Sequence, residues 1–368
     1  MVESPVTAPG SNVLLATKLH MPGPRPGLVP RPRLTARLDE GLARGVVLVC
    51  GPAGYGKTVL LADWARRGEL PAAWLSLDAG DNDPARFWRH AVAALDRACP
   101  GAGGRLAPLL GPPAPASFQG LVTALINDLA ADEAVVVLDD YHVIGSPQVH
   151  ESVAFLAEHR PAGVCVVLAS RSDPPLPLAR LRARGQLTEM RVAELRFTPA
   201  EAAELLQQAA SALPDASVVA LAARTEGWAA GLRLAALSLR GQDDAAAFVA
   251  AFTGSHRYVL DYLAEEVLDR QSGQVREFLL ETSVLERLSG PLCDAVTGRD
   301  GSQVLLERAE RAGLFLVPLD EVRGWWRYHH LFADLLRARL QQEQPGGVSG
   351  LHRNAAAWYA EPTRASGG

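Results

Sequence analysis

Residues 45–58 read GVVLVCGPAGYGKT, a short apolar run followed at once by a glycine-rich loop. The run is rich in β-branched side chains and predicts a buried strand, and residues 59–65 after the loop have helical character. The loop itself fits the pattern G-x-x-x-x-G-K-[ST]. A strand, a glycine-rich loop and a helix in this order predict a phosphate-binding loop (P-loop) in an α/β fold.

Each residue type in this loop has a physical reason. Glycines let backbone N–H groups face a phosphate chain where side chains would clash, and the helix N-terminus adds partial positive charge. We expect Lys57 to bridge the β- and γ-phosphates of ATP and Thr58 to place its hydroxyl on Mg²⁺. Lys57 is one of only two lysines among 36 basic residues. The expected phosphate-binding residues are Gly51, Pro52, Ala53, Gly54, Tyr55, Gly56, Lys57 and Thr58.

A second motif supplies carboxylates. Residues 134–140 read AVVVLDD, an aliphatic run that ends in two aspartates about 80 residues after the loop. Such a run is typical of a strand buried on both faces of a parallel sheet. We expect Asp139 to hold Mg²⁺ and Asp140 to orient or deprotonate the attacking water. The run is weak evidence alone, but together with the P-loop it indicates an ATP or ADP site with Mg²⁺.

Apolar runs alternate with helical segments in this part of the chain, the runs at residues 73–77, 163–169 and 186–190 and the helices at 84–98 and 118–131. The alternation predicts a parallel α/β sheet with ligands at the C-terminal ends of its strands. Arg171 follows one of these strand ends, where it is placed to read a γ-phosphate. By position alone, an ordinary surface arginine is an equally good interpretation.

The second half of the chain is predicted to be mainly helical. A capping box at residues 198–201 starts a helix that runs to about Ser211, and an interrupted helix at 218–239 completes a small lid. Later, two helices at 291–297 and 302–312 precede a hairpin at 314–329, which is the outline of a winged helix.

The helix before this hairpin is nearly neutral, since it carries Glu307, Arg308, Glu310 and Arg311. We therefore expect an internal regulatory role for the winged helix rather than DNA reading. Adjacent histidines, His329 and His330, lack a metal-binding spacing and are expected to pack or hydrogen-bond.

These elements give a fold class and a domain division. We expect a P-loop NTPase parallel sheet followed by a helical lid and a winged-helix domain. The expected segments are a flexible N-terminal segment (1–25), the P-loop domain (26–192), the lid (193–250), the winged helix (251–345) and the start of a helical-repeat region (346–368).

Composition narrows the class of protein. The net charge of −5 argues against a large sequence-independent nucleic-acid surface. No stretch of 18 apolar residues is present, so we expect no membrane contact, and four scattered cysteines do not form a metal or disulfide framework. A cytoplasmic location is the expectation that follows.

Several motifs in one order resemble the ATPase module of the large ATP-binding LuxR-type, MalT-like transcriptional regulators, which are STAND P-loop ATPases. Besides the P-loop, they are TKL (17–19), VPRPRL (29–34), LDDYH (138–142), ASRSDPPLPL (169–178), LRFT (195–198), TEGWAAGL (225–232) and YHHLF (328–332). The resemblance extends over roughly residues 13–360. One departure is Gly231-Leu232-Arg233, where related lid motifs carry Gly-x-Pro.

The resemblance implies a switch that ADP holds closed, that ATP and an inducer open with self-association, and that slow ATP hydrolysis resets. It implies that Arg171 senses the γ-phosphate, that His329 reaches the β-phosphate of ADP, and that Arg31 lies near the adenine. It also implies DNA contact only through a C-terminal domain absent from this chain, since residues 351–359 resemble the first helix of a repeat region. The alternatives are an ordinary P-loop enzyme, such as a kinase or AAA+-like remodelling ATPase, or a non-hydrolysing nucleotide-binding scaffold.

Overall fold

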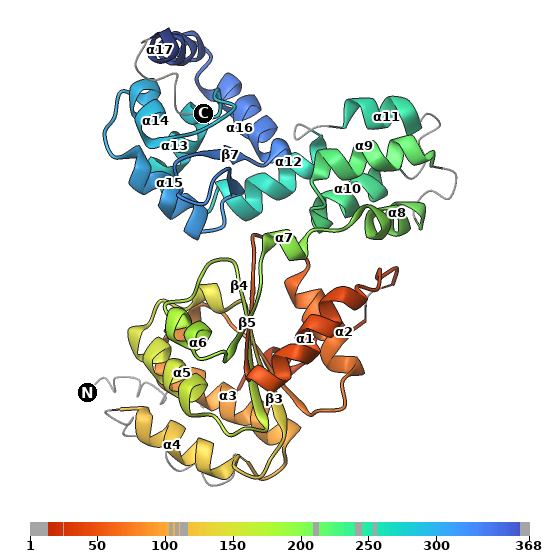
Figure 1. The fold of residues 1–368 in the computed structure, drawn as a ribbon, viewed down its shortest axis with the longest axis vertical. Helices are drawn as coiled ribbons and strands as arrows, with labels where there is room; N and C mark the ends of the chain where they lie inside the picture. The colour runs from red at the N-terminus through yellow and green to blue at the C-terminus, as the bar shows by residue number, and fades with distance from the viewer. Residues whose placement is uncertain are drawn as a thin grey trace, which may run out of the picture.

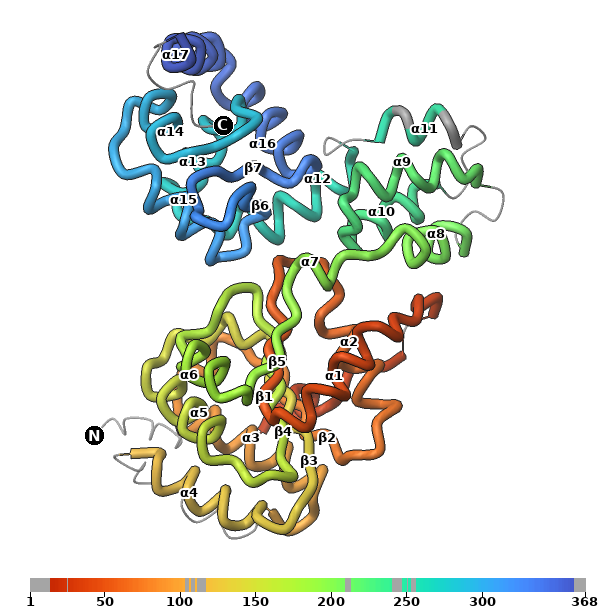
Figure 2. Tube along the Cα trace, in the orientation of Figure 1, coloured from red at the N-terminus to blue at the C-terminus, as the bar shows by residue number. Residues whose placement is uncertain are grey.

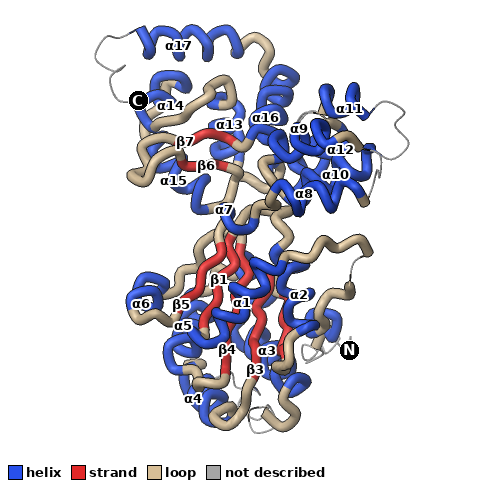
Figure 3. Tube along the Cα trace, turned by 45° about the vertical axis from the view of Figure 1, so that its right-hand side comes forward, coloured by secondary structure: helices blue, strands red, loops and turns tan. Residues whose placement is uncertain are grey.

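The N-terminal half of the chain forms a five-stranded parallel sheet, seen from two sides in Figures 1 and 3. The computed structural model describes residues 14–24, 26–102, 106, 110, 117–208, 213–239, 245–252 and 256–360. The strand order is β2-β3-β4-β1-β5, so the P-loop strand lies between two others. The strands are β1 (Val46–Cys50), β2 (Ala72–Ser76), β3 (Ala134–Asp139), β4 (Val164–Ser170) and β5 (Leu187–Met190).

Alternate side chains of the strands enter two apolar cores, one on each face of the sheet. In β1, Val47 and Val49 join the core under α1 (Pro32–Arg44) and α2 (Lys57–Arg67), and Val46 and Leu48 join the opposite core. Burial on both faces explains why β1, β3 and β4 are nearly continuous apolar runs. The opposite face is covered by α3 (Pro84–Ala98), α4 (Gln119–Asp128), α5 (Pro147–His159) and α6 (Leu178–Ala183).

The N-terminal segment differs from the expected flexible chain at residues 16–19. These form a 3₁₀ helix, η1 (Ala16–Leu19), which packs against β2 and α3. Lys18 is only 6% exposed, and its ammonium group pairs with Asp81 and Asp78. A buried lysine is stabilised by such pairing, so this part of the segment is held on the sheet domain. Residues 1–13 and 25 lie outside the described residues.

Short helices, from α8 (Pro199–Gln207) to α11 (Ala245–Ala251), follow the sheet and form the lid. The predicted capping box is present, since Thr198 and Glu201 bond to each other's backbone N–H groups. The helix it starts ends at Gln207, and the predicted extension toward Ser211 falls on residues outside the described part. The elements are α7 (Val192–Leu195), α8 (Pro199–Gln207), α9 (Asp215–Thr225), α10 (Ala229–Leu239) and α11 (Ala245–Ala251).

The last part of the chain contains the predicted hairpin between helices. Strands β6 (Leu316–Pro318) and β7 (Trp326–Tyr328) pair antiparallel. A linker helix, α12 (Arg257–Leu263) with the π-helical turn Ala264–Leu268, joins the lid to this region. The winged-helix region contains α13 (Gly273–Thr282), α14 (Gly290–Thr297), α15 (Ser302–Arg311), β6, β7 and α16 (His330–Glu343), and α17 (Val348–Ala360) follows.

Figure 2 shows the lid and the winged-helix region side by side above the sheet domain. The apolar core on the α1–α2 face of the sheet continues through the lid into the winged-helix region. The predicted fold class, a parallel α/β sheet followed by a helical lid and a winged helix, is confirmed. Within the described residues, no helix is long and apolar enough to span a membrane, and no group of three or more His, Cys, Asp or Glu side chains is arranged to hold a metal ion.

Candidate nucleotide-binding site

The loop of residues 51–56 joins β1 to α2 with the geometry of an anion cradle. Gly54 and Gly56 have positive φ values of 77° and 79°, which glycine adopts without steric penalty. Lys57 starts α2 and is only 7% exposed, and its Nζ donates to the carbonyl oxygens of Gly51 at 2.6 Å and Pro52 at 2.9 Å. Burial lowers the pKa of Lys57 to about 8 against the attraction of Asp140. The ammonium group therefore lies at the loop, where phosphate charge would stabilise it.

The second motif brings oxygen ligands to the same loop. Thr58 Oγ1 donates to Asp139 Oδ1 at 3.0 Å, and Asp139 is 2% exposed at the end of β3. Burial raises the pKa of Asp139 to about 6, and the neighbouring charge of Asp140 adds to this. A hydroxyl and a carboxylate in contact suit a hard cation such as Mg²⁺, which would favour the ionised carboxylate.

Asp140 follows the end of β3 and, unlike Asp139, has a partly exposed side chain. Its φ is +58°, and it begins the short turn Tyr141–Val143 with a side chain that is 47% exposed. His142 Nδ1 lies 3.8 Å from its Oδ1. Burial, followed by the charges of Arg171 and Lys57, lowers the pKa of His142 to about 4, so this imidazole is neutral at pH 7. Asp140 is thus more accessible to water than Asp139.

Arg171 lies directly after β4 but does not extend into solvent. Its Nη1 donates to the carbonyl oxygen of Glu266 at 3.2 Å, and its Nη2 donates to Glu266 Oε2 at 3.0 Å. Glu266 belongs to the π-helical turn of the linker helix. Sequence reasoning placed Arg171 at the strand end but missed this partner 95 residues away.

An apolar cavity of about 370 Å³ opens beside the P-loop. It is bounded by the loop, by the start of α2, by α10 and by the segment before α1. Its walls are mainly hydrocarbon and backbone, which suits a flat heterocycle. The lining side chains include Val29, Val59, Leu60, Phe197, Leu205 and Tyr262.

Arg31 lies in the wall of this cavity. Its guanidinium donates to the carbonyl oxygens of Leu195 and Arg196 at 2.8 Å, lies 4.4 Å above the Phe197 ring and has its Nε 3.3 Å from Glu201. Burial lowers its pKa to about 10 against the attraction of Glu201. The proximity of Arg31 to an adenine therefore stays a prediction. The contacts that the structure shows join the segment before α1 to the start of the lid.

Two lid residues that sequence reasoning did not assign to the site bind the P-loop directly. Trp228 Nε1 donates to the carbonyl oxygen of Ala53 at 3.0 Å, and the backbone N–H of Ala230 donates to the carbonyl oxygen of Gly54 at 2.9 Å. A Cβ at Gly54 would lie 2.6 Å from the Cβ of Ala230, so this approach requires glycine. The only sequence signal for these contacts was the motif at residues 225–232.

His329 is 1% exposed and joins the winged-helix region to the lid. Its Nε2 lies 2.9 Å from the carbonyl oxygen of Thr225, and since a carbonyl only accepts, Nε2 carries the proton. Its ring lies edge-on to Trp228 and Phe315, with centroids 6.0 and 5.6 Å away. Burial lowers its pKa to about 4. In this structure its hydrogen bond goes to the lid, so a contact with a β-phosphate stays a prediction.

Glu226 is the centre of a second lid contact that the sequence did not reveal. It is 7% exposed, and its two carboxylate oxygens accept from Arg327 at 2.8 and 2.7 Å. Arg196 at 3.2 Å and the backbone N–H of His330 at 3.2 Å complete its partners. Burial opposes ionisation, but the bonds from Arg327 and the surrounding positive charge outweigh it and lower the pKa of Glu226 to about 2.

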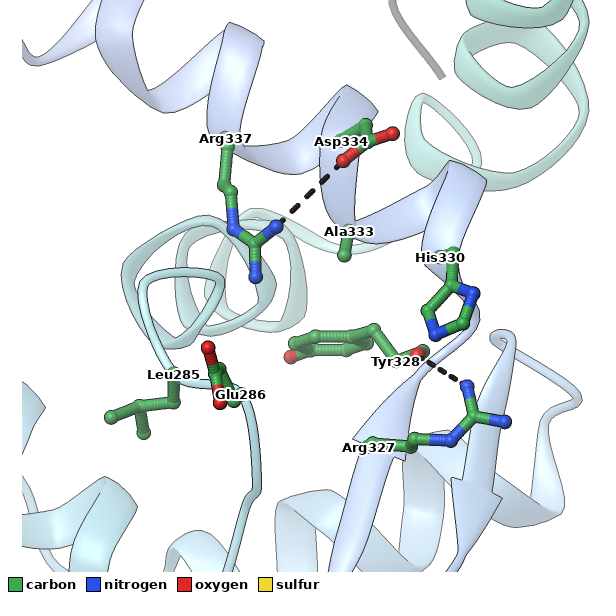
Figure 4. Close-up of a pocket in the computed structure, with 8 residues that line it drawn as sticks. All are labelled: Leu285, Glu286, Arg327, Tyr328, His330, Ala333, Asp334 and Arg337. Carbon is green, nitrogen blue, oxygen red and sulfur yellow. Dashed lines mark hydrogen bonds and ion pairs between the residues drawn. The ribbon is translucent and has the colours of Figure 1, made fainter. Parts of the chain in front are cut away.

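A second cavity of about 370 Å³ lies within the winged-helix region (Figure 4). Tyr328 crosses its centre, with His330 and Arg327 at one end and Asp334 and Arg337 at the other. Its cationic groups already have partners, since Arg327 binds Glu226 and Arg337 binds the carbonyl oxygen of Ser283 at 2.9 Å. The charge pattern therefore does not favour phosphate in this cavity.

Comparison with known proteins identifies two families along the chain. The AAA domain family matches residues 41–173, which contain the P-loop and strands β1 to β4. The MalT winged helix domain family matches residues 264–348, from the π-helical turn to the start of α17.

Whole-chain comparisons agree with this arrangement. The serine/threonine-protein kinase PknK of Mycobacterium tuberculosis is 38% identical over 352 residues, which are 94% of this chain and 32% of that protein. The HTH-type transcriptional regulator MalT of Serratia proteamaculans is 38% identical over 356 residues, 95% of this chain and 39% of that protein. The chain thus spans about a third of the length of these relatives.

One solved structure shares the fold. A Walker-type ATPase of Pyrococcus abyssi superposes with a TM-score of 0.56 at 15% sequence identity, covering 86% of this chain and 98% of that one. At this level of identity the likeness concerns the fold, a P-loop domain followed by further helical structure.

Proposed function

This chain carries the AAA P-loop and winged-helix modules of MalT-like transcriptional regulators, and on that premise we propose that it is an ATP-controlled conformational switch. In the proposal, ADP favours the arrangement described above, and ATP favours an arrangement in which the winged-helix region leaves the P-loop. Slow hydrolysis of ATP restores the first arrangement. A nucleotide shifts such an equilibrium only through its different affinity for the two states, and the γ-phosphate is the difference between these ligands.

One observation carries the proposal: the winged-helix region rests on the phosphate loop itself. The turn before β6 contains Gly313, and a Cβ there would lie 2.6 Å from the carbonyl oxygen of Arg171 and 3.5 Å from Pro52 Cα. The lid reaches the same loop through Trp228 and Ala230. Because the sheet domain, the lid and the winged-helix region converge on one phosphate-binding loop, the phosphates are placed to control their arrangement.

The residues of the site have distinct proposed roles. The backbone of residues 51–56 and Lys57 bind the phosphates, and the cavity lined in part by Arg31 takes the adenine. Thr58 and Asp139 hold Mg²⁺, which supplies positive charge between the β- and γ-phosphates. Asp140, which is exposed, orients the attacking water.

Two residues from outside the loop complete the proposed site. Arg171 stabilises the γ-phosphate through a guanidinium that already lies at the end of β4, and His329 senses the diphosphate state from its place between lid and winged helix. We propose the domain division given above, with boundaries at residues 1–25, 26–192, 193–250, 251–345 and 346–368. We also propose that the protein self-associates in the ATP state. Contact with DNA is proposed to occur through a further C-terminal domain.

The alternatives have less support. Arg311 of α15 pairs with Glu307, and Arg323 of the hairpin pairs with Glu310, which leaves little positive charge for DNA reading. An ordinary kinase or remodelling ATPase needs no winged helix packed on its P-loop. A scaffold that binds without hydrolysis differs from the proposal only in turnover, which is measurable.

The first test removes the ammonium group of the P-loop. Lys57→Ala is expected to abolish binding of ADP and ATP, because no other side chain of the loop carries positive charge. Isothermal titration with each nucleotide measures this, and circular dichroism checks that the variant is folded. Micromolar ATP affinity in a folded Lys57→Ala protein would contradict the assignment of this loop as the phosphate-binding site. Mass spectrometry of nucleotide released from freshly purified wild-type protein adds a direct check, with ADP expected.

The second test separates the switch from the scaffold. Asp140→Asn keeps the shape of the side chain but removes its charge, so ATP is expected to stay bound while hydrolysis slows by about 10²-fold. Single-turnover hydrolysis of radiolabelled ATP measures the rate. An unchanged rate would remove Asp140 from the proposed chemistry, and no hydrolysis in wild-type protein would favour the scaffold.

A further inference from the structure

The partner of Arg171 suggests how the site distinguishes ATP from ADP. Arg171 is the only residue assigned above to the γ-phosphate from outside the P-loop, and both of its Nη groups are bound to Glu266. The carboxylate is 30% exposed, so water reaches the pair. A guanidinium in this state already has an anionic ligand at the strand end where a γ-phosphate would arrive.

The backbone around Glu266 is shaped for this contact. Residues 264–268 form a π-helical turn, closed by a bond from the N–H of Asp269 to the carbonyl oxygen of Ala264 at 2.9 Å. Such turns are rare and occur often at functional sites. Glu266 lies in the last turn, where free carbonyl groups give the helix end a partial negative charge. Arg171 therefore binds a carboxylate and a helix C-terminus together.

The carboxylate of Glu266 also binds a second cation, which would stabilise it if Arg171 moved away. Arg270, in the turn that follows the π-helical segment, donates from its Nη2 to Glu266 Oε1 at 2.6 Å. If Arg171 turned to another anion, Glu266 would retain this bond and its access to water. The exchange therefore leaves no buried charge unpaired, in contrast to the heavy penalty for breaking a fully buried pair.

We propose that Glu266 is a specificity-determining residue that makes the closed arrangement favour a nucleoside diphosphate over a triphosphate. Its carboxylate holds Arg171 away from a γ-phosphate and places a negative charge next to the one the γ-phosphate would bring. ADP has no γ-phosphate, so its affinity is reduced neither by the loss of Arg171 nor by repulsion from Glu266. This inference deepens the proposed function and rests on it.

Through the same contact, binding of a γ-phosphate would also change how the sheet domain is joined to the linker helix. Glu266 belongs to the helix that joins the lid to the winged-helix region, and Arg171 belongs to the sheet domain. When Arg171 binds a γ-phosphate instead, the sheet domain loses its ion pair to that helix. The two anions compete for one cation, so ATP binding and closure of the winged-helix region oppose each other.

The experiment compares two charge-neutralising variants in the full chain. Glu266→Gln keeps the shape of the side chain and removes its charge. Glu265→Gln removes the same charge from the adjacent, exposed position, so both variants have the same net charge. Dissociation constants are measured for ADP and for a non-hydrolysable ATP analogue, each with Mg²⁺. In Glu266→Gln we expect the analogue to bind about five- to tenfold more tightly relative to ADP, while Glu265→Gln keeps the wild-type ratio.

A third variant tests whether Glu266 acts through Arg171. In an Arg171→Ala background, the effect of Glu266→Gln on the affinity ratio is expected to be clearly smaller than in the wild-type background, because only the direct repulsion between Glu266 and the γ-phosphate remains. An unchanged ratio in Glu266→Gln, or an equal change in Glu265→Gln, would overturn the inference while leaving the switch intact. Failure of the wild-type protein to bind either nucleotide would instead overturn the proposed function, and this inference with it.

Discussion

Two arginine–glutamate contacts hold the winged-helix side of the molecule, and they differ in strength. Between lid and hairpin, Arg327 binds both oxygens of Glu226, which is 7% exposed. Between sheet domain and linker helix, Arg171 binds one carboxylate oxygen and the backbone carbonyl of Glu266, whose side chain is 30% exposed. A bidentate, buried pair is costly to break, and a monodentate, hydrated one is not. The comparison teaches that the lid–hairpin contact is the stronger of the two, so under the proposed switch we expect the contact with the sheet domain to release first.

The largest expected effect comes from the stronger contact. Glu226→Ala leaves Arg327 and Arg196, which are 24% and 31% exposed, without their carboxylate, so the local stability at the lid–hairpin contact is expected to fall by about 2 kcal/mol. Native-state amide hydrogen exchange across α9 and β7 measures this as faster exchange. Wild-type protection of both elements in Glu226→Ala would show that the apolar core alone joins lid and winged helix.

The same contact has an acid dependence that a second variant isolates. Because the pKa of Glu226 is lowered to about 2 from an ordinary 4.5, its contribution to stability is present above pH 4.5 and is lost as the pH falls from 4.5 toward 2. Glu226→Gln has no such contribution to lose. The difference in stability between wild type and Glu226→Gln should therefore shrink across this window, and a constant difference would contradict the strength assigned to the pair.

A smaller effect is expected where the winged-helix region rests on the sheet domain. Gly313 and Gly298 have nearly equal φ values, +67° and +68°, but a Cβ would clash with the Arg171 carbonyl at Gly313 and meets nothing within 4 Å at Gly298. Both alanine variants should lose about 1 kcal/mol from the left-handed backbone. Only Gly313→Ala should release ADP several-fold faster, measured by stopped-flow fluorescence of a labelled ADP. Equal release rates in the two variants would show that this contact does not control the nucleotide.

The smallest effect is expected at the histidine between the two modules. His329→Ala removes one hydrogen bond to Thr225 and its edge-on contact with Trp228, the residue that caps the P-loop. A hydrogen bond of about 1 kcal/mol corresponds to roughly fivefold faster ADP release. The control is His330→Ala, which removes a side chain that is 63% exposed and 3.5 Å from Glu226 but keeps the backbone hydrogen bond to Glu226. If His329→Ala releases ADP at the wild-type rate, His329 is a packing residue.

The sequence predicted the elements whose signal is local. Burial on both faces makes β1, β3 and β4 nearly continuous apolar runs, and the capping box at Thr198 is a direct bond between residues three apart. The P-loop was predictable because its chemistry needs glycine and lysine at fixed spacing. Helix ends were less certain: the helix predicted at 118–131 ends at Asp128.

Contacts between distant segments had no local signal. The bond from Arg171 to Glu266 joins residues 95 apart, and the one from Trp228 to Ala53 joins residues 175 apart. A glutamate in a helix looks the same whether it faces water or an arginine of another domain. The π-helical turn at 264–268 was likewise not predicted from the sequence, and only the structure reveals it.

The scarcity of lysine has a practical consequence. The chain has two lysines, and both are largely enclosed, Lys18 against Asp81 and Lys57 beneath the P-loop carbonyls. An amine-reactive label therefore meets hardly any accessible ε-amino group while the fold is intact. Peptide mapping of the label at these two positions turns them into separate reporters, one for detachment of the 3₁₀ helix at residues 16–19 and one for exposure of the P-loop.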